Sequence, residues 1–394
     1  SPEIFWREAG KQWYSEAEAF IGTPEKMKTA ALRTVEGETD PEKKLRKLYV
    51  LAQQITNITY ESSGAGTGAA NHSVADVLAR GYGSRNEIAE TFAALARASG
   101  FEAELLRASS RKDRVFDPKM LLRRQLEAEL VRVKLNGSEL FLDPGTKLCP
   151  FGMVAWMFSS TPALLLHPDG GNFVVIPTAT AEKSVRRRIA NLTLEADGSA
   201  HGEVTLQFTG NEALERRLDA LGRDDTERRR EMKQELSRWL PANARTEPKE
   251  VDGWVSMEDP LVARFDVELP SFASVADRTM SVPANLFHSD TGGAFDAQER
   301  KYPVYFPFTY EELDQVTIQP PKGYTVSQLP AAADTRLAST RLITRRAVDS
   351  NLVHATRALV VNSIYFRQEE FQELKEFFDH MRASDQERVA LTRP

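Results

Sequence analysis

Apolar residues recur at three- and four-residue intervals through the first hundred positions, which is the spacing of one helix face. The best-marked helix begins at Asp40, an N-cap residue, followed by Pro41 at the first helical position. Its apolar stripe continues to about residue 58. Three further helices are expected over 4–20, 26–32 and 74–79.

Another helix signal follows the turn Gly81-Tyr82-Gly83. Ser84 and Glu87 stand three positions apart, as in a capping box, so a helix is predicted from here to the glycine at position 100. The Asn136-Gly137 pair is typical of a two-residue hairpin turn. Strands are expected around that turn and before it, over 102–107, 126–135 and 139–142. Residues 1–150 therefore indicate helices packed on an antiparallel sheet, an α+β arrangement.

The pattern changes near residue 186. Short alternating strands separated by proline and glycine turns fill most of 186–394, with helices expected near 212–240 and 369–381. Such spacing is typical of a β-sandwich-like domain. We therefore expect two domains, residues 1–185 and residues 186–394.

Composition narrows the class of protein. The chain has 394 residues, 41% of them hydrophobic and 27% charged, with a formal net charge of −6. These values indicate a globular chain of two or three domains, and the acidic balance gives no support for a nucleic-acid partner. No apolar run approaches the roughly 18 residues that span a membrane, so no spanning segment is predicted.

Cysteine and histidine are too scarce for common metal sites. Cys149 is the only cysteine, and the six histidines form neither an HExxH motif nor a close pair. A disulfide within the chain, a CxxC zinc site and an iron–sulfur cluster are thereby excluded. We predict no metal and no other cofactor.

Seven basic residues lie between positions 107 and 124, interrupted by Asp113 and Asp117. Such a run suits an acidic partner or a nucleic acid, or it forms an ordinary solvated loop. The scarcity of aromatic residues within it favours the solvated loop.

The order of motifs in the first 150 residues resembles the bacterial transglutaminase-like superfamily, which has a papain-like fold. The shared features are a long helix, a Gly-rich loop over 61–71, the turn at 81–83 with its capped helix, a strand, a hairpin and Leu142-Asp143-Pro144. The segments 303–308, 320–324 and 365–371 look like the β-rich region that follows this core in a group of large bacterial proteins. The opening residues 1–6 look like the start of the core just after a preceding β-domain.

The resemblance implies a cysteine at the helix start, a histidine on the first hairpin strand and an aspartate on the next. In this chain the corresponding positions carry Arg85, Ala128 and Asp143. Only the aspartate is kept, so the resemblance implies a degenerate triad with no catalytic residue.

Two orientations are open for the Arg85 side chain. It either turns into solvent, or it enters the cleft and pairs with Asp143, Glu127 or Glu129, which would satisfy a buried carboxylate. The residues expected to line the cleft come from the helix start, the hairpin and the segment after it: Tyr82, Ser84, Arg85, Glu127, Glu129, Asp143 and Trp156.

We therefore expect an inactive transglutaminase-like protein that acts as a binding or structural module. The resemblance implies a peptide or protein partner at the former cleft and a location outside the cytoplasm, either periplasmic or secreted, in a protein of the cell envelope, although the given chain shows no signal peptide. The alternative is an active transglutaminase or amidase in which Cys149 meets a distant histidine, His72 or His167. A serine mechanism through Ser84 and a purely architectural segment are the remaining hypotheses, and the oligomeric state stays open.

Overall fold

The computed structural model describes residues 1–23, 25–61, 69–112, 114–287, 295 and 299–394. Residues 62–68, the middle of the predicted Gly-rich loop, lie outside this part. The chain forms two compact units. The first contains Ser1–Ala179 with Arg217–Gly222, and the second contains Thr180–Arg216 with Arg223–Pro394.

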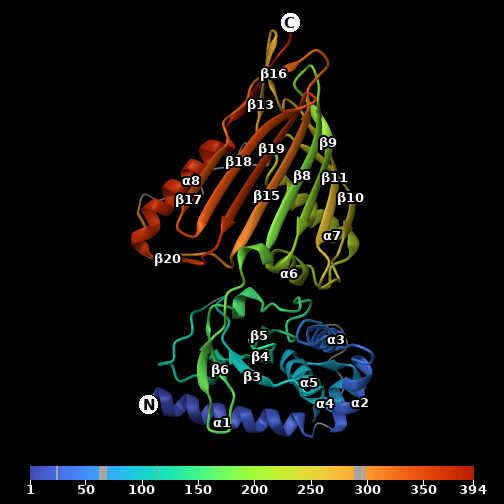
Figure 1. Ribbon diagram of the computed structural model, residues 1–394, viewed down its shortest axis with the longest axis vertical. Helices are drawn as coiled ribbons and strands as arrows, with labels where there is room; N and C mark the ends of the chain where they lie inside the picture. Colours follow the sequence, from blue (N-terminus) through green and yellow to red (C-terminus); the bar gives the residue numbers. More distant parts are fainter. Residues whose placement is uncertain (24, 62–68, 113, 288–294, 296–298) are drawn as a thin grey trace. The chain divides into compact units, whose positions relative to one another are not determined.

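Helix α5 is the centre of the first unit. It packs against the four preceding helices and against two strands of a sheet (Figure 1). Its residues from Ile88 to Ala96 are buried, so every face of its middle turns is covered. The helices of this unit are α1 (Pro2–Ile21), α2 (Glu25–Thr34), α3 (Pro41–Gln53), α4 (Val74–Arg80) and α5 (Arg85–Ala98).

The predicted start of α3 is confirmed, but its predicted end near residue 58 is wrong. Asp40 caps the helix by accepting a hydrogen bond from the Lys43 N–H, 2.9 Å away. The helix stops at Gln53 because strand β1 (Thr56–Asn57) pairs in parallel with strand β2 (Tyr82–Gly83). Long-range pairing thus overrides the apolar stripe that continues along the sequence.

An antiparallel sheet of order β5-β4-β3-β6-β7 completes the first unit. Asn136 and Gly137 have φ angles of 51° and 79° and form the predicted tight turn between β4 and β5. The last two strands were not expected from the sequence. The strands are β3 (Ala103–Ala108), β4 (Ala128–Leu135), β5 (Ser138–Leu142), β6 (Pro162–Leu165) and β7 (Asn172–Val175).

The second unit is β-rich, as predicted, and an eight-stranded sheet forms most of it (Figure 1). The strand order is β10-β11-β9-β8-β15-β19-β18-β17, and only β8 and β15 pair in parallel. The strands are β8 (Val185–Leu194), β9 (Ala200–Phe208), β10 (Arg245–Asp252), β11 (Leu261–Leu269), β15 (Tyr310–Gln319), β17 (Ala333–Leu337), β18 (Thr340–Asp349) and β19 (Leu352–Val361).

Smaller elements complete this unit. A four-stranded sheet contains β12 (Ser274–Ala276), β13 (Thr279–Pro283), β21 (Arg388–Thr392) and β16 (Thr325–Gln328), and a two-stranded one contains β14 (Val304–Tyr305) and β20 (Tyr365–Phe366). The helices are most of α6 (Gly210–Asp219), which belongs to this unit up to Arg216, together with α7 (Asp225–Ser237) and α8 (Phe371–Asp385), near the two predicted helical regions. Phe371, Leu374 and Phe378 of α8 pack with Leu342 and Leu359 of the large sheet. A helix therefore covers this part of the sheet.

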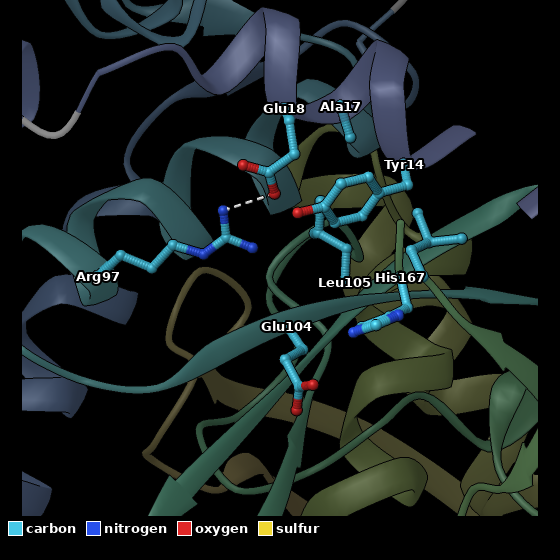
Figure 2. A pocket seen from close by; sticks show the side chains of 8 residues that line it. Tyr14, Ala17, Glu18, Arg97, Glu104, Leu105 and His167 are labelled. Carbon is cyan, nitrogen blue, oxygen red and sulfur yellow. Dashed lines mark hydrogen bonds and ion pairs between the residues drawn. The ribbon is translucent and has the colours of Figure 1, made fainter. Parts of the chain in front are cut away.

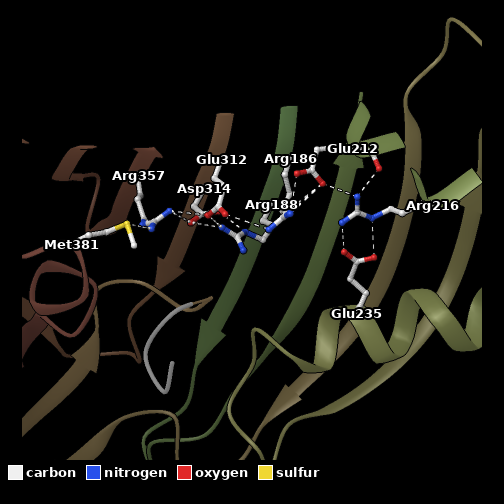
Figure 3. Close-up of polar contacts among 9 residues, drawn as sticks. All are labelled: Arg186, Arg188, Glu212, Arg216, Glu235, Glu312, Asp314, Arg357 and Met381. Atoms are coloured by element: carbon white, nitrogen blue, oxygen red, sulfur yellow. Dashed lines mark hydrogen bonds and ion pairs between the residues drawn. The ribbon is translucent and has the colours of Figure 1, made fainter. Parts of the chain in front are cut away.

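A network of buried ion pairs crosses the large sheet (Figure 3). Arg188 on β8 is fully buried, 2.6 Å from Asp314 and 2.9 Å from Glu312 on β15. Arg357 on β19 lies 3.2 Å from the same Glu312. Because each guanidinium reaches acidic groups on the neighbouring strand, the buried charges are compensated within the sheet.

Candidate site at the start of helix α5

The capping box predicted at Ser84 is present. The Ser84 hydroxyl accepts from the Glu87 N–H at 3.4 Å, and the Ser84 N–H donates to the Glu87 carboxylate at 2.6 Å. The Arg85 N–H donates to the Thr59 hydroxyl at 3.0 Å. These contacts satisfy N–H groups that a helix start leaves without intrahelical partners. Ser84 is thus a cap residue, which gives no support to a serine nucleophile.

The side chain of Asn86 binds the start of α5 to strand β4. Its amide nitrogen donates to the Glu127 carbonyl at 3.2 Å, and its oxygen accepts from the Glu129 N–H at 2.9 Å. The two contacts flank Ala128, which is fully buried. The structure therefore brings together the helix start and the strand position that the resemblance equates with nucleophile and base.

Asp143 follows strand β5 and is fully buried. Its Oδ1 accepts from the Thr146 N–H at 3.0 Å, and its Oδ2 accepts from the Ala155 N–H at 3.3 Å. Nη2 of Arg85 lies 3.4 Å from Oδ1. Burial raises the pKa of Asp143, while Arg85 and the hydrogen bonds oppose that rise. The cation and the hydrogen-bond donors thus favour the ionised form of this buried carboxyl group.

Arg85 turns into the cleft rather than into solvent. Its guanidinium carbon lies 4.4 Å from the centroid of the Phe158 ring, a cation–π geometry, and only 14% of its side chain is exposed. Its Nη2 also lies 3.4 Å from the Thr146 hydroxyl. Of the carboxylates considered from the sequence, it is Asp143 that pairs with Arg85. Glu127 is exposed instead.

The loop that carries Asp143 is held by α3 and β1. The Gln53 amide donates to the carbonyls of Pro144 and Thr146, at 3.1 and 2.9 Å. The Asn57 amide donates to the Gly145 carbonyl at 2.9 Å. A Cβ atom at Gly145 would lie 2.5 Å from the Arg85 carbonyl oxygen, so only glycine allows this close approach.

Glu129 belongs to a second buried group beside the site. It is fully buried, and its Oε1 lies 2.7 Å from Nη2 of Arg107. Burial raises the pKa of Glu129 and also raises the pKa of its neighbour Glu90, where the Glu129 carboxyl adds to the effect. The burial of two neighbouring carboxyl groups therefore favours retention of a proton on the pair, while the guanidinium groups of Arg107 and Arg85 oppose the rise in the pKa of Glu129.

The other two predicted lining residues lie in different surroundings. The Tyr82 hydroxyl donates to the Ala69 carbonyl at 2.7 Å. Trp156 lies under the guanidinium of Arg111, 5.1 Å from the ring centroid. Asn86 and Thr146 make contacts that sequence reasoning missed, whereas Phe158, like Trp156, follows the Asp143 loop and was open as a cleft or core residue. Asn86 was detectable only as a polar residue within the capping box.

Cys149 is fully buried and lies in the same loop as Asp143. Its thiol is 3.7 Å from the Met153 carbonyl, and burial, followed by the nearby Asp143, raises the thiol pKa well above its usual value. His72 and His167 are exposed, and the ring of His167 contacts Asp169 at 2.8 Å. The structure does not bring either histidine to Cys149.

A separate cavity of about 200 Å³ lies elsewhere in the first unit (Figure 2). Tyr14 and Glu18 of α1, Arg97 of α5 and His167 line it. Arg97 pairs with Glu18 at 2.8 Å. Apart from His167, the alternative partner considered for Cys149, the cavity contains none of the residues predicted for a site.

Neither a metal-binding cluster nor a membrane-spanning helix is found among the described residues. Within them, no cluster of three or more metal-binding side chains occurs. No described helix is long and apolar enough to cross a membrane.

Two family models match this chain, one in each of its two regions. Residues 28–119 match the transglutaminase-like superfamily, and residues 277–391 match a domain of unknown function, DUF3858. No curated protein matches the sequence. Arg85 lies inside the first match, whereas Ala128 and Asp143 lie beyond it.

A solved structure described as a "putative protease" from Parabacteroides distasonis ATCC 8503 has a similar fold, with a TM-score of 0.54 and 10% sequence identity. The alignment covers 98% of this chain and 58% of that chain, so this chain spans little more than half the length of that protein. These matches confirm the transglutaminase-like core and the β-rich region that follows it.

Proposed function

This chain carries a transglutaminase-like domain followed by a β-rich domain, and we propose that it works without the thiol chemistry of that superfamily. It is a non-catalytic module whose former active-site cleft is closed by a side chain of its own. The proposal depends on one observation, the inward orientation of Arg85 against Asp143.

Arg85 takes the position where a nucleophile would begin α5. A guanidinium stays protonated at any physiological pH, so it has no electron pair to attack a carbonyl. Ala128, between the two strand residues that Asn86 contacts, carries only a methyl group and offers no proton acceptor. The remaining member, Asp143, pairs with the cation and cannot by itself form an acyl intermediate.

Cys149 is a poor substitute nucleophile. A thiolate is the reactive form, and burial together with the Asp143 charge keeps this thiol protonated. Activated cysteines instead lie in accessible, electropositive surroundings. This supports the non-catalytic proposal over the thiol-dependent alternative.

With Arg85 in the cleft, a structural role is favoured over a peptide site at that position. The guanidinium fills space that a substrate side chain would need, and its contacts with Asp143 and Phe158 stabilise the loop. A peptide or protein partner would have to displace Arg85 or bind elsewhere. We also propose, from the resemblance alone, that the module works outside the cytoplasm, either periplasmic or secreted.

Two assays on the purified chain test the proposal. Labelling by a thiol-reactive probe between about pH 5 and pH 9 should be slow until the protein unfolds, because Cys149 is buried. Incorporation of a fluorescent primary amine into a glutamine-containing acceptor, and hydrolysis of that acceptor, should not exceed the rate without protein. Turnover that disappears in Cys149→Ser would overturn the proposal.

A further inference from the structure

The loop of residues 114–124, here called the basic loop, presents apolar side chains to solvent. Val115 is 74% exposed, Met120 46%, Leu121 45% and Leu122 39%. Three of these residues are consecutive in the sequence. Scattered exposed apolar residues are ordinary, but a contiguous group points to a binding surface.

Hydrogen bonds from Gln125 and Trp6 fix the conformation of the loop, so the exposure of its apolar side chains is a property of the folded protein. Gln125 is buried and donates to the carbonyls of Asp117 and Met120, at 3.0 and 2.6 Å. Its oxygen accepts from the Asp117 N–H at 3.1 Å. The Trp6 indole donates to the Pro118 carbonyl at 2.8 Å.

Aromatic packing anchors the loop from below. Phe116 is buried, and its ring centroid lies 5.4 Å from that of Trp6 and 5.3 Å from that of Phe173 on β7. Phe173 is itself 37% exposed. Phe116 thus points into the first unit, whereas its neighbour Val115 points into solvent. One side of the loop therefore packs against the unit, and the other side is exposed.

Basic residues flank the exposed apolar group in the sequence. The basic loop holds four basic residues and one acidic residue, a local net charge of +3 in a chain whose net charge is −6. Among the described residues, Arg114, Lys119 and Arg124 make no ion pair, and all three are exposed. Arg123 differs, because its Nη1 donates to the Gln12 side chain at 2.5 Å.

We propose that the basic loop docks this protein on an anionic lipid surface. Met120, Leu121 and Leu122 would enter the boundary between headgroups and acyl chains, while Arg114, Lys119 and Arg124 would contact lipid phosphates. Exposed apolar side chains beside cations fit a bilayer, which accepts insertion without a preformed pocket. The charge complementarity selects anionic over zwitterionic lipid, and the apolar group adds an attraction that salt does not screen.

Vesicle sedimentation with the full chain tests the docking. The chain should bind vesicles of phosphatidylcholine mixed with phosphatidylglycerol, and much less those of phosphatidylcholine alone. Met120→Ser/Leu121→Ser/Leu122→Ser should reduce binding at least tenfold. Lys119→Glu should reduce it by about fivefold or more, consistent with the attraction of a single basic residue to an anionic surface.

Matched controls lie in the second unit. Val255 is 79% exposed, and Lys322 is also exposed. Lys322→Glu makes the same charge reversal outside the basic loop, and Val255→Ser replaces one exposed apolar side chain outside it with serine, so both should retain wild-type binding. Circular dichroism should show that every variant stays folded.

Leu121→Trp adds a tryptophan in the basic loop to the five tryptophans of the wild-type chain, so the difference between the emission of the variant and that of the wild type reports insertion. On anionic vesicles the emission of the added tryptophan should shift to shorter wavelength and be quenched by brominated acyl chains. Absence of binding by the wild-type chain, binding unaffected by the triple substitution, or an unquenched tryptophan would each overturn the proposal. Binding of the loop to polyglutamate but not to vesicles would instead assign an acidic polypeptide partner.

Discussion

Nη2 of Arg85 lies 3.4 Å from Oδ1 of Asp143, although 58 positions separate the two residues in the sequence. The contact joins the first turn of α5 to the loop after β5. Because Asp143 is fully buried, the guanidinium is the nearby positive charge that compensates it.

Replacement of this cation should destabilise the first unit. Arg85→Met keeps the length of the side chain but leaves the Asp143 carboxylate without its charge partner, and we expect a loss of about 2–3 kcal/mol in the free energy of unfolding. Urea denaturation followed by circular dichroism measures this loss.

A double-mutant cycle separates the ion pair from general packing. Asp143→Asn removes the negative charge, so adding Arg85→Met to it should cost less than Arg85→Met alone. A coupling energy of about 1 kcal/mol or more is expected. Strict additivity of the two substitutions would show that the pair contributes no specific stability.

The assignment of Ala128 to the base position can be tested by rebuilding the triad. In a Cys149→Ser background, Arg85→Cys with Ala128→His places a thiol at the helix start and an imidazole opposite it. The helix dipole and the imidazole should lower the thiol pKa below its usual value of about 8.5. The pH dependence of alkylation by iodoacetamide measures that pKa.

Arg85→Cys without Ala128→His is the control for this design. It should show a smaller decrease in thiol pKa, because only the helix dipole remains. An unchanged alkylation profile on adding Ala128→His would mean that position 128 does not face the start of α5.

Local signals explain what was predictable around this site. The capping box at Ser84 and the Asn136-Gly137 turn depend on hydrogen bonds and φ angles within four residues. Their presence could therefore be inferred from sequence alone. The orientation of Arg85 depends on Phe158, far along the chain, so the pattern left both orientations open.

The buried carboxyl pair should make stability depend on pH. Burial, with the Glu129 carboxyl as the next cause, raises the pKa of Glu90 from an ordinary 4.5 to about 10. The folded state thus keeps a proton that the unfolded chain loses above about pH 4.5. The contribution of Glu90 to the free energy of unfolding is complete below about pH 4.5. It decreases as pH rises and is lost near pH 10.

Glu90→Gln removes this titration, so the stability of the variant should decrease less between about pH 5 and pH 9. The midpoints of urea denaturation at several pH values give the slope of stability against pH for the wild type and for the variant. Glu127→Gln, at an exposed glutamate of the same unit, should keep the wild-type slope. Equal slopes for wild type and Glu90→Gln would contradict a proton retained at Glu90.

The network in the second unit should be sensitive to loss of one partner. Arg188→Ala removes one buried cation that pairs with Asp314 and Glu312. We expect the free energy of unfolding to decrease by about 3–5 kcal/mol. Arg341→Ala breaks an exposed pair with Asp334 on the same sheet and should leave stability nearly unchanged. Chemical denaturation of both variants provides the comparison, and similar losses would contradict the role of burial.

Long-range pairing explains what sequence reasoning missed. The end of α3 is set by the pairing of Thr56 with Tyr82, and the β6–β7 hairpin by the edge of β3. The basic character of 107–124 was visible, but its outward apolar group was not, because the anchoring depends on Trp6 and Phe173.

The tight approach at Gly145 has a consequence for how such a domain can change. Because backbone atoms of the turn and of Arg85 leave no room for a side chain, the two segments meet whatever groups the neighbouring positions carry. The side chain at position 85 can therefore be exchanged without moving the backbone frame that holds it. A bulky residue at 145 would separate the segments and undo that frame in an active or an inactive chain alike.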